Sequence, residues 1–361
     1  MSSRDSFLKA IAVTPGRAGS VTLVEAARPT PAAGEALLRT NKIGICGTDL
    51  EIIQGSYGEA PLGSDYLIIG HECLATVEEI PSNSAGMKKG DLVVPTVRRP
   101  DTCFNCQGGE SDMCLTGQYR EHGIKGLHGF CSEYSLSDLN YLVPVPSELS
   151  EVAVLLEPTS VAEKGVFQSF KIQERMIWKP QRALVLGTGP VGLLTSLLLR
   201  LRGLDVTAVA TRPNDSLKAH IVEKIGGTYA NADEQPIAGL GKFDLIMEET
   251  GVASLAAEAQ GLLNNNGVFC LLGIYRPSLA TKDIGHSYDD IVLGNKIMFG
   301  SVNANKRYFL SGIQDFKTIQ QRFPGVLKSM FTKIGRPSEY LQAYNPTRDD
   351  IKSVIDFQTL N

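Results

Sequence analysis

The sequence predicts an α/β protein of two domains, a β-rich domain and a domain built around a parallel sheet. Three observations lead to this prediction. The chain has 361 residues, which suits about two domains of ordinary size. Short runs that alternate apolar and polar residues dominate its first third, and apolar strands alternate with helical patterns from residue 182 onward.

The first part of the chain has the pattern of small antiparallel strands. Residues 8–45 alternate apolar and polar side chains in short runs that Pro and Gly interrupt. The pattern continues through residues 67–69, 74–80 and 91–95. Residues 98–130 are rich in Gly, Cys and polar residues, which predicts a long lobe. A loop of this length usually has a function or is held together by something.

The second part of the chain changes to a strand–helix–strand pattern. Apolar strands over 182–187 and 205–211 enclose an apolar helix over 191–203, and an Ala-rich helix follows over 254–263. This alternation indicates a buried parallel sheet. A further helix is predicted over 308–323, in a final segment expected to pack back on the first domain.

Composition and charge exclude several classes of protein. The net charge of −4 offers no basic surface for nucleic acid. No stretch approaches the roughly 18 apolar residues of a membrane span, and the N-terminus lacks the apolar core of an export signal. The seven cysteines are therefore expected to be thiols or metal ligands. We expect a cytoplasmic protein that binds neither nucleic acid nor a membrane.

A GxGxxG stands between the first strand and helix of the second domain, at Gly187, Thr188, Gly189, Pro190, Val191 and Gly192. In this context it predicts a dinucleotide-binding turn. The first Gly allows a tight turn, the second lets the backbone approach a pyrophosphate, and the third permits close packing. The following helix N-terminus offers amides to the phosphates. A plain strand–helix turn is the alternative.

The residues after the second strand predict the cofactor preference. An acidic residue there would bond the ribose 2′-hydroxyl of NAD, but the chain has Thr211 and Arg212. An Arg at this point favours the 2′-phosphate of NADP. Asp205 lies at the start of the strand and cannot replace the acid. We expect NADP to be preferred over NAD; an exposed Arg without a ligand is the alternative.

Cys46, His71 and Glu72 combine the ligand types of an open, catalytic zinc site. Each of them alone would be read as an ordinary core residue. Glycines flank both segments, however, so two sharply bending loops can converge on one ion. Glu157 is the candidate fourth ligand, because a carboxylate in an otherwise apolar run needs a partner when it is buried.

A second cysteine cluster lies in the 98–130 lobe. Cys103, Cys106 and Cys114 have the spacing of a structural zinc site that lacks one ligand, and Asp101 is the residue that would complete it. A lobe without metal is the alternative. The other cysteines are predicted to be core residues: Cys73, Cys131 and Cys270.

These segments, taken in order, resemble the zinc-dependent medium-chain dehydrogenases over essentially the whole chain. The resemblance rests on Gly44–Asp49, Gly70–Glu72, Gly90–Pro95, the cysteine lobe and Gly187–Gly192. Within that superfamily, four further segments are similar to archaeal-type glucose 1-dehydrogenases: Arg98–Pro100, Gly123–Phe130, Glu157–Pro158 and Gly300–Asn303. The resemblance implies a GroES-like catalytic domain over 1–178 with its lobe at 98–130, a Rossmann domain over 179–304, and a C-terminal segment, 305–361, that returns to the catalytic domain.

The resemblance also implies the roles of single residues. The catalytic set is Cys46, Thr48, His71, Glu72 and Glu157, in which Thr48 serves proton transfer and the other four surround the zinc ion. Thr48, Glu157, Glu121 and Asn303 are implied to contact the sugar. Beyond the GxGxxG, the implied cofactor contacts are Thr211, Arg212, Thr250, Gly273 and Asn303.

The expected reaction is the zinc-dependent, NAD(P)-linked oxidation of an aldose, D-glucose or a related sugar, at C1 to the aldonolactone. Zinc would act as a Lewis acid on the anomeric hydroxyl while C1 gives hydride to the nicotinamide. The alternatives are another sugar derivative, a polyol or an alcohol as substrate, a zinc-free reductase, and a non-catalytic binding protein. A homodimer or homotetramer is expected, with the strand over 296–300 as an association surface.

Overall fold

The computed structural model describes residues 7–81, 86–275 and 284–359, and the chain divides into two compact units. Unit 1 comprises Met1–Glu157, Asn303–Ile313 and Leu327–Asn361, so it contains both ends of the chain. Unit 2 comprises Pro158–Val302 and Gln314–Val326. The domain limits expected from the sequence stay a prediction.

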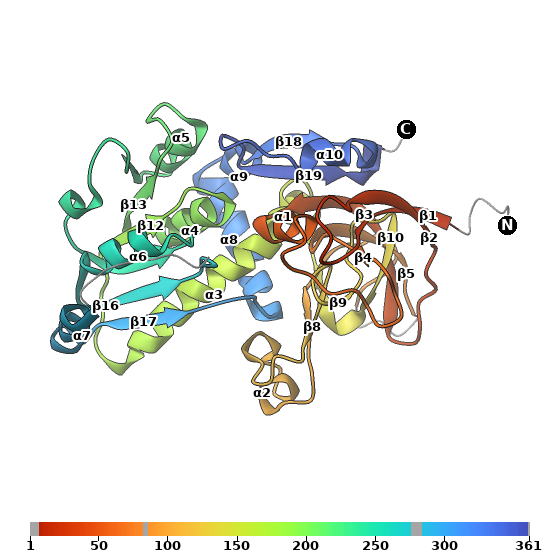
Figure 1. The fold of residues 1–361 in the computed structure, drawn as a ribbon, viewed down its shortest axis with the longest axis horizontal. Helices are drawn as coiled ribbons and strands as arrows, with labels where there is room; N and C mark the ends of the chain where they lie inside the picture. Colours follow the sequence, from red (N-terminus) through yellow and green to blue (C-terminus); the bar gives the residue numbers. More distant parts are fainter. Residues whose placement is uncertain (1–6, 82–85, 276–283, 360–361) are drawn as a thin grey trace. The chain divides into compact units, whose positions relative to one another are not determined.

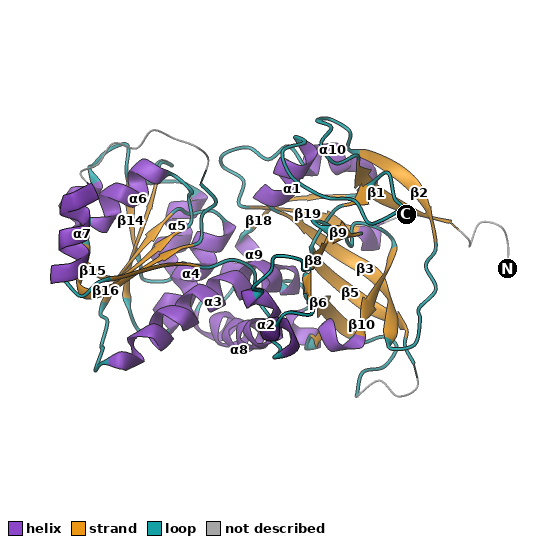
Figure 2. Cartoon of the chain, turned by 60° about the horizontal axis from the view of Figure 1, so that its bottom comes forward, coloured by secondary structure: helices purple, strands orange, loops and turns teal. Residues whose placement is uncertain are grey.

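Unit 1 consists mainly of strands in three sheets. The largest has the order β11-β6-β5-β3-β19-β18, and β10 pairs with β3 (Figure 2). The second sheet has the order β2-β1-β4 and the third β7-β8-β9. The strands are β1 (Phe7–Val13), β2 (Thr22–Ala27), β3 (Glu35–Ile45), β4 (Leu67–Ile68), β5 (Glu72–Glu79), β6 (Leu92–Pro95), β7 (Arg98–Arg99), β8 (Arg120–His122), β9 (Gly126–Leu127), β10 (Tyr134–Asp138), β11 (Leu142–Pro144), β18 (Phe331–Gly335) and β19 (Lys352–Asp356).

Short helices complete unit 1, and two long helices run on into unit 2. The helices are α1 (Gly47–Ile53), α2 (Phe104–Gln107), α3 (Leu156–Ile172), α8 (Lys306–Arg322), α9 (Val326–Ser329) and α10 (Tyr340–Ala343). The alternating strands bury one apolar core, which includes Ile11, Leu38, Ile43, Val77 and Phe130. Burial of one such side chain contributes roughly 1.5–3 kcal/mol. Cys73 and Cys131 belong to this core, as predicted.

Three neighbouring strands of the large sheet, β5, β3 and β19, have ends that meet at the same end of the sheet and bring polar residues together there. β3 ends at Ile45, directly before Cys46, and β5 begins at Glu72, with Gly44 opposite Glu72 in the register. β19 pairs with the other side of β3, with Ser353 opposite Ile45. This end of the sheet therefore gathers chain segments that are far apart in the sequence.

Unit 2 contains a six-stranded sheet of order β14-β13-β12-β15-β16-β17, in which all neighbours are parallel. This is the doubly wound order expected for a dinucleotide-binding sheet (Figure 1). Its elements are β12 (Arg182–Leu186), α4 (Pro190–Leu201), β13 (Asp205–Ala210), α5 (Leu217–Lys224), β14 (Thr228–Asn231), β15 (Phe243–Glu248), α6 (Ala253–Gln260), β16 (Leu263–Leu271), α7 (Ile284–Leu293) and β17 (Ile297–Gly300).

Helices cover both faces of this sheet. Ile246 and Met247 are neighbours in β15, so their side chains point to opposite faces. Ile246 belongs to an apolar cluster with Ala256 of α6. Met247 lies against α3, because a Cβ at Gly165 would come within 3.0 Å of its Cε. Cys270 is fully buried in β16, as predicted.

One helix is shorter than the sequence pattern suggests. The Ala-rich helix expected over 254–263 ends at Gln260, and Leu263 already begins β16. Gly261 follows the last helical residue, and the apolar side chains beyond it are buried in the sheet rather than in a helix. No helix among the described residues combines the length and apolar character needed to cross a membrane.

Candidate active site

Cys46, Asp49 and His71 form a polar cluster where two loops of unit 1 meet. Cys46 caps α1: its Sγ accepts a hydrogen bond from the Thr48 amide at 3.3 Å, and the Asp49 carboxylate accepts one from the Cys46 amide at 3.0 Å. His71 Nε2 lies 3.1 Å from Cys46 Sγ, and Nδ1 lies 3.3 Å from Asp49 Oδ1. The Asp49 charge favours a proton on Nδ1, although the two atoms do not have the geometry of a hydrogen bond.

The cluster concentrates negative charge around His71. Burial disfavours an imidazolium, yet the charges of Cys46 and Asp49 raise the pKa of His71 well above its usual range. Asp49 is fully buried and His71 is 4% exposed. A thiolate and an imidazole this close, beside a carboxylate, are the donor set that suits Zn²⁺.

Glu72, the first residue of β5, is held by Lys352 of β19. Lys352 Nζ lies 2.7 and 2.6 Å from the two Glu72 oxygens and donates a third bond to Ile45 O at 3.1 Å. Both side chains are 1% exposed. A Cβ on Gly44 would overlap the Glu72 carboxylate, so this pairing depends on glycine. Lys352 therefore balances the Glu72 charge.

Glu157 lies in the first turn of α3, next to the same residues. Burial raises the pKa of Glu157 to about 7 against the attraction of His71, and the Glu72 charge adds to the rise. A carboxyl group with this pKa can exchange a proton near neutral pH, and it would be ionised as a metal ligand.

The four predicted zinc ligands lie in one neighbourhood. The donor atoms of His71, Glu72 and Glu157 all lie within 4.8 Å of one another, and so do those of Cys46, Asp49 and His71. His71 belongs to both groups. Asp49 stands behind the imidazole, where a second carboxylate would fix the orientation of a metal-bound histidine.

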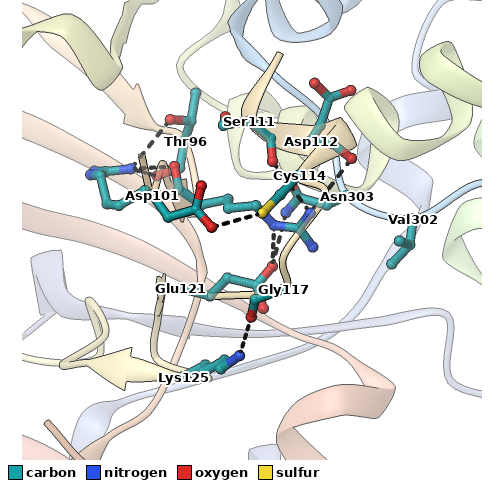
Figure 3. A network of polar contacts seen from close by, with 12 residues as sticks. Thr96, Asp101, Ser111, Asp112, Cys114, Gly117, Glu121, Lys125, Val302 and Asn303 are labelled. Carbon is teal, nitrogen blue, oxygen red and sulfur yellow. Dashed lines mark hydrogen bonds and ion pairs between the residues drawn. The ribbon is translucent and has the colours of Figure 1, made fainter. Parts of the chain in front are cut away.

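Glu121 and Asn303, the predicted sugar contacts, touch each other in unit 1 (Figure 3). Asn303 Nδ2 lies 3.4 Å from Glu121 Oε1, and Arg98 Nε donates to the same oxygen at 2.9 Å. Glu121 is 5% exposed. Asn303 Oδ1 is buried and has no hydrogen-bond partner within the described part of the chain. Thr48 is half-buried in the first turn of α1, and its hydroxyl bonds none of the described residues.

The GxGxxG of unit 2 has the three glycine geometries that the motif requires. Gly187 has φ 110°, in the region that favours glycine. A Cβ on Gly189 would meet nothing within 4 Å, so the backbone there is open to a ligand. A Cβ on Gly192 would overlap the Gly187 carbonyl, so the helix can approach the strand only without a side chain. Pro190 begins α4, whose first amides are left for a phosphate.

Thr250 and Gly273 lie just after the neighbouring strands β15 and β16. The fully buried Glu248 accepts hydrogen bonds from the Thr250 amide at 2.7 Å, from the Thr250 hydroxyl and from the Tyr275 hydroxyl at 2.5 Å. A Cβ on Gly273 would lie 2.6 Å from Glu248 Oε2. Glu248 therefore ties the two loops together at the carboxyl end of the sheet, where such sheets bind cofactors.

Thr211 and Arg212 directly follow β13. The Tyr229 hydroxyl donates to Arg212 O at 2.7 Å and accepts from Arg212 N at 3.1 Å, which fixes the backbone there. Thr211 is exposed and Arg212 is half-buried. Asp205 lies at the opposite end of the strand, opposite Arg182 in the register.

The lobe brings together the four residues predicted from its sequence. The donor atoms of Asp101, Cys103, Cys106 and Cys114 lie within 4.8 Å of one another. Cys114 Sγ lies 3.1 Å from Asp101 Oδ2 (Figure 3). It lies 3.9 Å from Cys103 Sγ. Hydrogen bonds from Thr116 and from the Cys103 amide hold the pKa of Asp101 well below its usual range. The Asp101 carboxylate therefore lies ionised beside the three thiols.

Three residues that support the site were given no function in the site by the sequence analysis. Asp49 had a signal, because its position three residues after Cys46 is that of a capping box. Arg98 had a weaker one, as a basic residue beside the lobe. Lys352 had none, because 280 positions separate it from Glu72.

The sheet order of unit 2, its GxGxxG turn and the thiol–imidazole–carboxylate cluster of unit 1 define a class, the zinc-type dehydrogenases with a nucleotide-binding sheet. Comparison with known proteins identifies the family. The family model "Glucose dehydrogenase C-terminus" matches residues 150–357, and "Alcohol dehydrogenase GroES-like domain" matches residues 32–147.

Full-length relatives agree with these matches. The chain is 46% identical to glucose 1-dehydrogenase of Methanocella arvoryzae, over 97% of this chain and 99% of the relative. It is 48% identical to that of Thermoproteus tenax, over 98% and 100%. The structure of Haloferax mediterranei glucose dehydrogenase in complex with NADP, Zn and gluconolactone is 34% identical, with a TM-score of 0.90 over 98% of this chain and 100% of that one. The chain belongs to the glucose 1-dehydrogenase family of zinc-dependent medium-chain dehydrogenases, and the predicted fold class is confirmed.

Proposed function

We propose that this protein oxidises D-glucose at C1 to its lactone, with NADP as hydride acceptor and a zinc ion at Cys46 and His71. The observation that carries the proposal is the thiol–imidazole pair at 3.1 Å, oriented by Asp49. Two points support it: the identity of 46–48% to glucose 1-dehydrogenases over nearly the whole chain, and the NADP, Zn and gluconolactone in the similar Haloferax structure.

In this proposal Cys46, His71, Glu72 and Glu157 surround the metal. When bound, the zinc ion polarises the C1 hydroxyl of the sugar and the nicotinamide accepts hydride from C1. Asp49 would hold the imidazole in the tautomer whose Nε2 is a ligand. The Thr48 hydroxyl would relay the proton that the sugar hydroxyl loses, accepting it while passing its own proton on to solvent water. The catalytic set is Cys46, Thr48, His71, Glu72 and Glu157, and Asp49 positions the imidazole.

Glu121 and Asn303 recognise sugar hydroxyls. Glu121 is a buried acceptor fixed by Arg98 at 2.9 Å, and the Asn303 amide oxygen has an acceptor position without a described partner. A buried polar pair discriminates strongly against substrates without the matching hydroxyl, because the pair is then left unsatisfied. This favours an aldose over a simple alcohol. A related sugar or a polyol is the second candidate substrate.

The GxGxxG holds the cofactor pyrophosphate and Arg212 its 2′-phosphate, which makes NADP the preferred cofactor. Thr211, Thr250, Gly273 and Asn303 are the further cofactor contacts. We extend the proposal to a structural zinc on Asp101 and the three lobe cysteines. The homodimer or homotetramer and the cytoplasmic location stay predictions.

A substrate panel tests the proposal. NADP and NAD reduction rates are compared for D-glucose, D-galactose, D-xylose, sorbitol and ethanol, and the sugar product is identified as lactone or aldonate. We expect the highest kcat/KM for an aldose with NADP. The variant Glu121→Gln should raise the KM for glucose, while the surface variant Glu151→Gln should not. Faster turnover of sorbitol or ethanol than of every aldose would contradict the proposal.

A further inference from the structure

A cavity of about 720 Å³ lies inside unit 1, apart from the residues described so far. Its lining residues come from β1, β2, β7, β8 and β10 and from the segments beside them. Neither the four zinc-site residues nor Glu121 and Asn303 line it. The volume is that of a site for a small organic molecule, which typically needs about 300–1,000 Å³.

The cavity lies behind the strand pair that carries the proposed sugar contact. Successive side chains of a strand point to opposite faces, so Glu121 faces away from its neighbours Arg120 and His122. Arg98 and Arg99 are successive residues of β7, so their side chains also point to opposite faces. The lining agrees, because Arg99, Arg120 and His122 line the cavity and Arg98 and Glu121 do not.

Arg99 places a buried positive charge at this cavity without an ion pair to a described carboxylate, although the charge of Asp138 acts on it. Arg99 is 7% exposed. Its Nη1 donates to Thr96 O at 2.8 Å and its Nη2 to Ser137 Oγ at 3.0 Å, and the guanidinium lies 4.2 Å from the centroid of the Tyr141 ring. It forms no ion pair with any carboxylate of the described residues, and Nε has no acceptor among them. A buried charge is normally paired, but Arg99 has only the more distant charge of Asp138 and the Tyr141 ring in place of a direct ion pair.

Arg120 doubles this charge at the same wall. Arg99 and Arg120 are directly opposite in the β7–β8 register, with side chains on one face. Like charges in such a cross-strand pair are destabilising unless something compensates them. Glu35 and Asp138 also line the cavity, but each accepts a backbone amide, at 3.0 and 2.8 Å, and neither pairs with an arginine.

The two histidines of the cavity are neutral and have defined tautomers. Ile68 N donates to His128 Nδ1 at 3.1 Å, so the His128 proton is on Nε2. His122 Nδ1 lies 2.7 Å from His128 O and therefore donates to it. Burial and the Arg99 charge lower the pKa of His122 to about 3. The His128 ring stacks on Tyr66, with centroids 5.1 Å apart, and adds a flat wall.

We propose that this cavity is a second ligand site, which takes a small organic phosphate with its phosphate held by Arg99 and Arg120. Paired guanidinium groups provide the fork of donors that phosphate oxygens match, and phosphate carries enough charge to compensate both. The organic part lies along the Tyr66–His128 wall. The site is independent of the proposed oxidation of glucose, because none of the proposed catalytic residues lines it.

Calorimetric titration of the full-length protein tests the proposal. The protein is first saturated with NADP, so that the nucleotide site of unit 2 is filled, and is then titrated with AMP, adenosine or inorganic phosphate. We expect AMP to bind the saturated protein, with adenosine and inorganic phosphate each roughly tenfold weaker or more, since each lacks one part of the ligand.

Variants locate the binding. Arg120→Gln changes an exposed side chain and should weaken AMP by roughly tenfold without changing NADP affinity. Arg99→Gln should do the same, and Arg17→Gln, an exposed arginine outside the cavity, should change nothing. Three results would overturn the proposal: no AMP binding at millimolar concentration, AMP that more NADP displaces, or equal AMP affinity in Arg120→Gln and the unaltered protein.

Discussion

The buried ion pair of Lys352 with Glu72 predicts a large loss of folding stability when Lys352 is replaced. Its Nζ lies 2.7 and 2.6 Å from the Glu72 oxygens, and both side chains are 1% exposed. Replacing it by Met removes the ammonium and leaves a carboxylate buried without its counterion. Breaking a buried pair from one side costs about 3–5 kcal/mol. We expect Lys352→Met to lower the free energy of unfolding by about that amount.

A control variant at an exposed ion pair shows how much of the stability loss comes from the burial of the Lys352–Glu72 pair. Lys328 makes the same kind of bond to Glu151, at 3.0 Å, but both side chains are 66% exposed. Lys328→Met should therefore cost about 0–1 kcal/mol. The double variant Lys352→Met with Glu72→Gln should be more stable than Lys352→Met alone, because it removes the stranded charge.

The assay is equilibrium urea unfolding of the zinc-free protein, since a metal ion would offer Glu72 another partner. Fluorescence of the single tryptophan, Trp178, and circular dichroism report the transition. If the Lys352 and Lys328 variants lose equal stability, or if the double variant is no more stable than Lys352→Met, the reasoning about this buried pair is wrong.

Four further predictions concern the rest of the molecule. Burial raises the pKa of Glu249 to about 8, so between about pH 5 and pH 8 the folded chain keeps a proton that the unfolded chain releases. Over that range this group lowers the free energy of unfolding by about 1.4 kcal/mol per pH unit. Glu249→Gln should reduce this pH dependence of the free energy of unfolding, measured by urea unfolding, and an unchanged pH dependence would contradict the reasoning. Gly189→Ala should weaken NADPH in fluorescence titration at an unchanged melting temperature, whereas Gly192→Ala should lower the melting temperature; equal effects would count against the glycine roles. Arg212→Ala should raise the KM for NADP roughly tenfold without raising that for NAD, and a parallel rise would remove its role. Asp101→Ala should reduce the zinc content by one ion per chain without loss of turnover, and an unchanged zinc content would refute the lobe site.

Much of the fold could be predicted because its signals are local. The apolar strands of unit 2 and the GxGxxG between β12 and α4 have the spacing that their structures require. The helix expected to reach Leu263 ends earlier because its local signal is ambiguous. A short apolar run after Gly261 suits a helix or a buried strand equally, and the pairing of β16 with β15 decides between them.

The closeness of Cys46 and His71 could be predicted from the sequence, but the residues that support them could not. Cys46 and His71 stand beside glycines that mark the loops, and both lie where the sequence suggests. Lys352 reaches Glu72 only because β19 pairs with β3, a contact between the two ends of the chain. The cavity behind β8 was also out of reach, because it depends on which faces of β7, β8 and β10 are turned together.

The central claim is that Cys46 holds a catalytic zinc ion. Zinc content and glucose-dependent NADP reduction are measured on the same samples of the unaltered protein, of Cys46→Ser and of Cys270→Ala, which removes a buried thiol from unit 2. We expect Cys46→Ser to lose turnover together with one zinc ion per chain, and Cys270→Ala to keep both. Full turnover in Cys46→Ser, or an unchanged zinc content, would contradict the account.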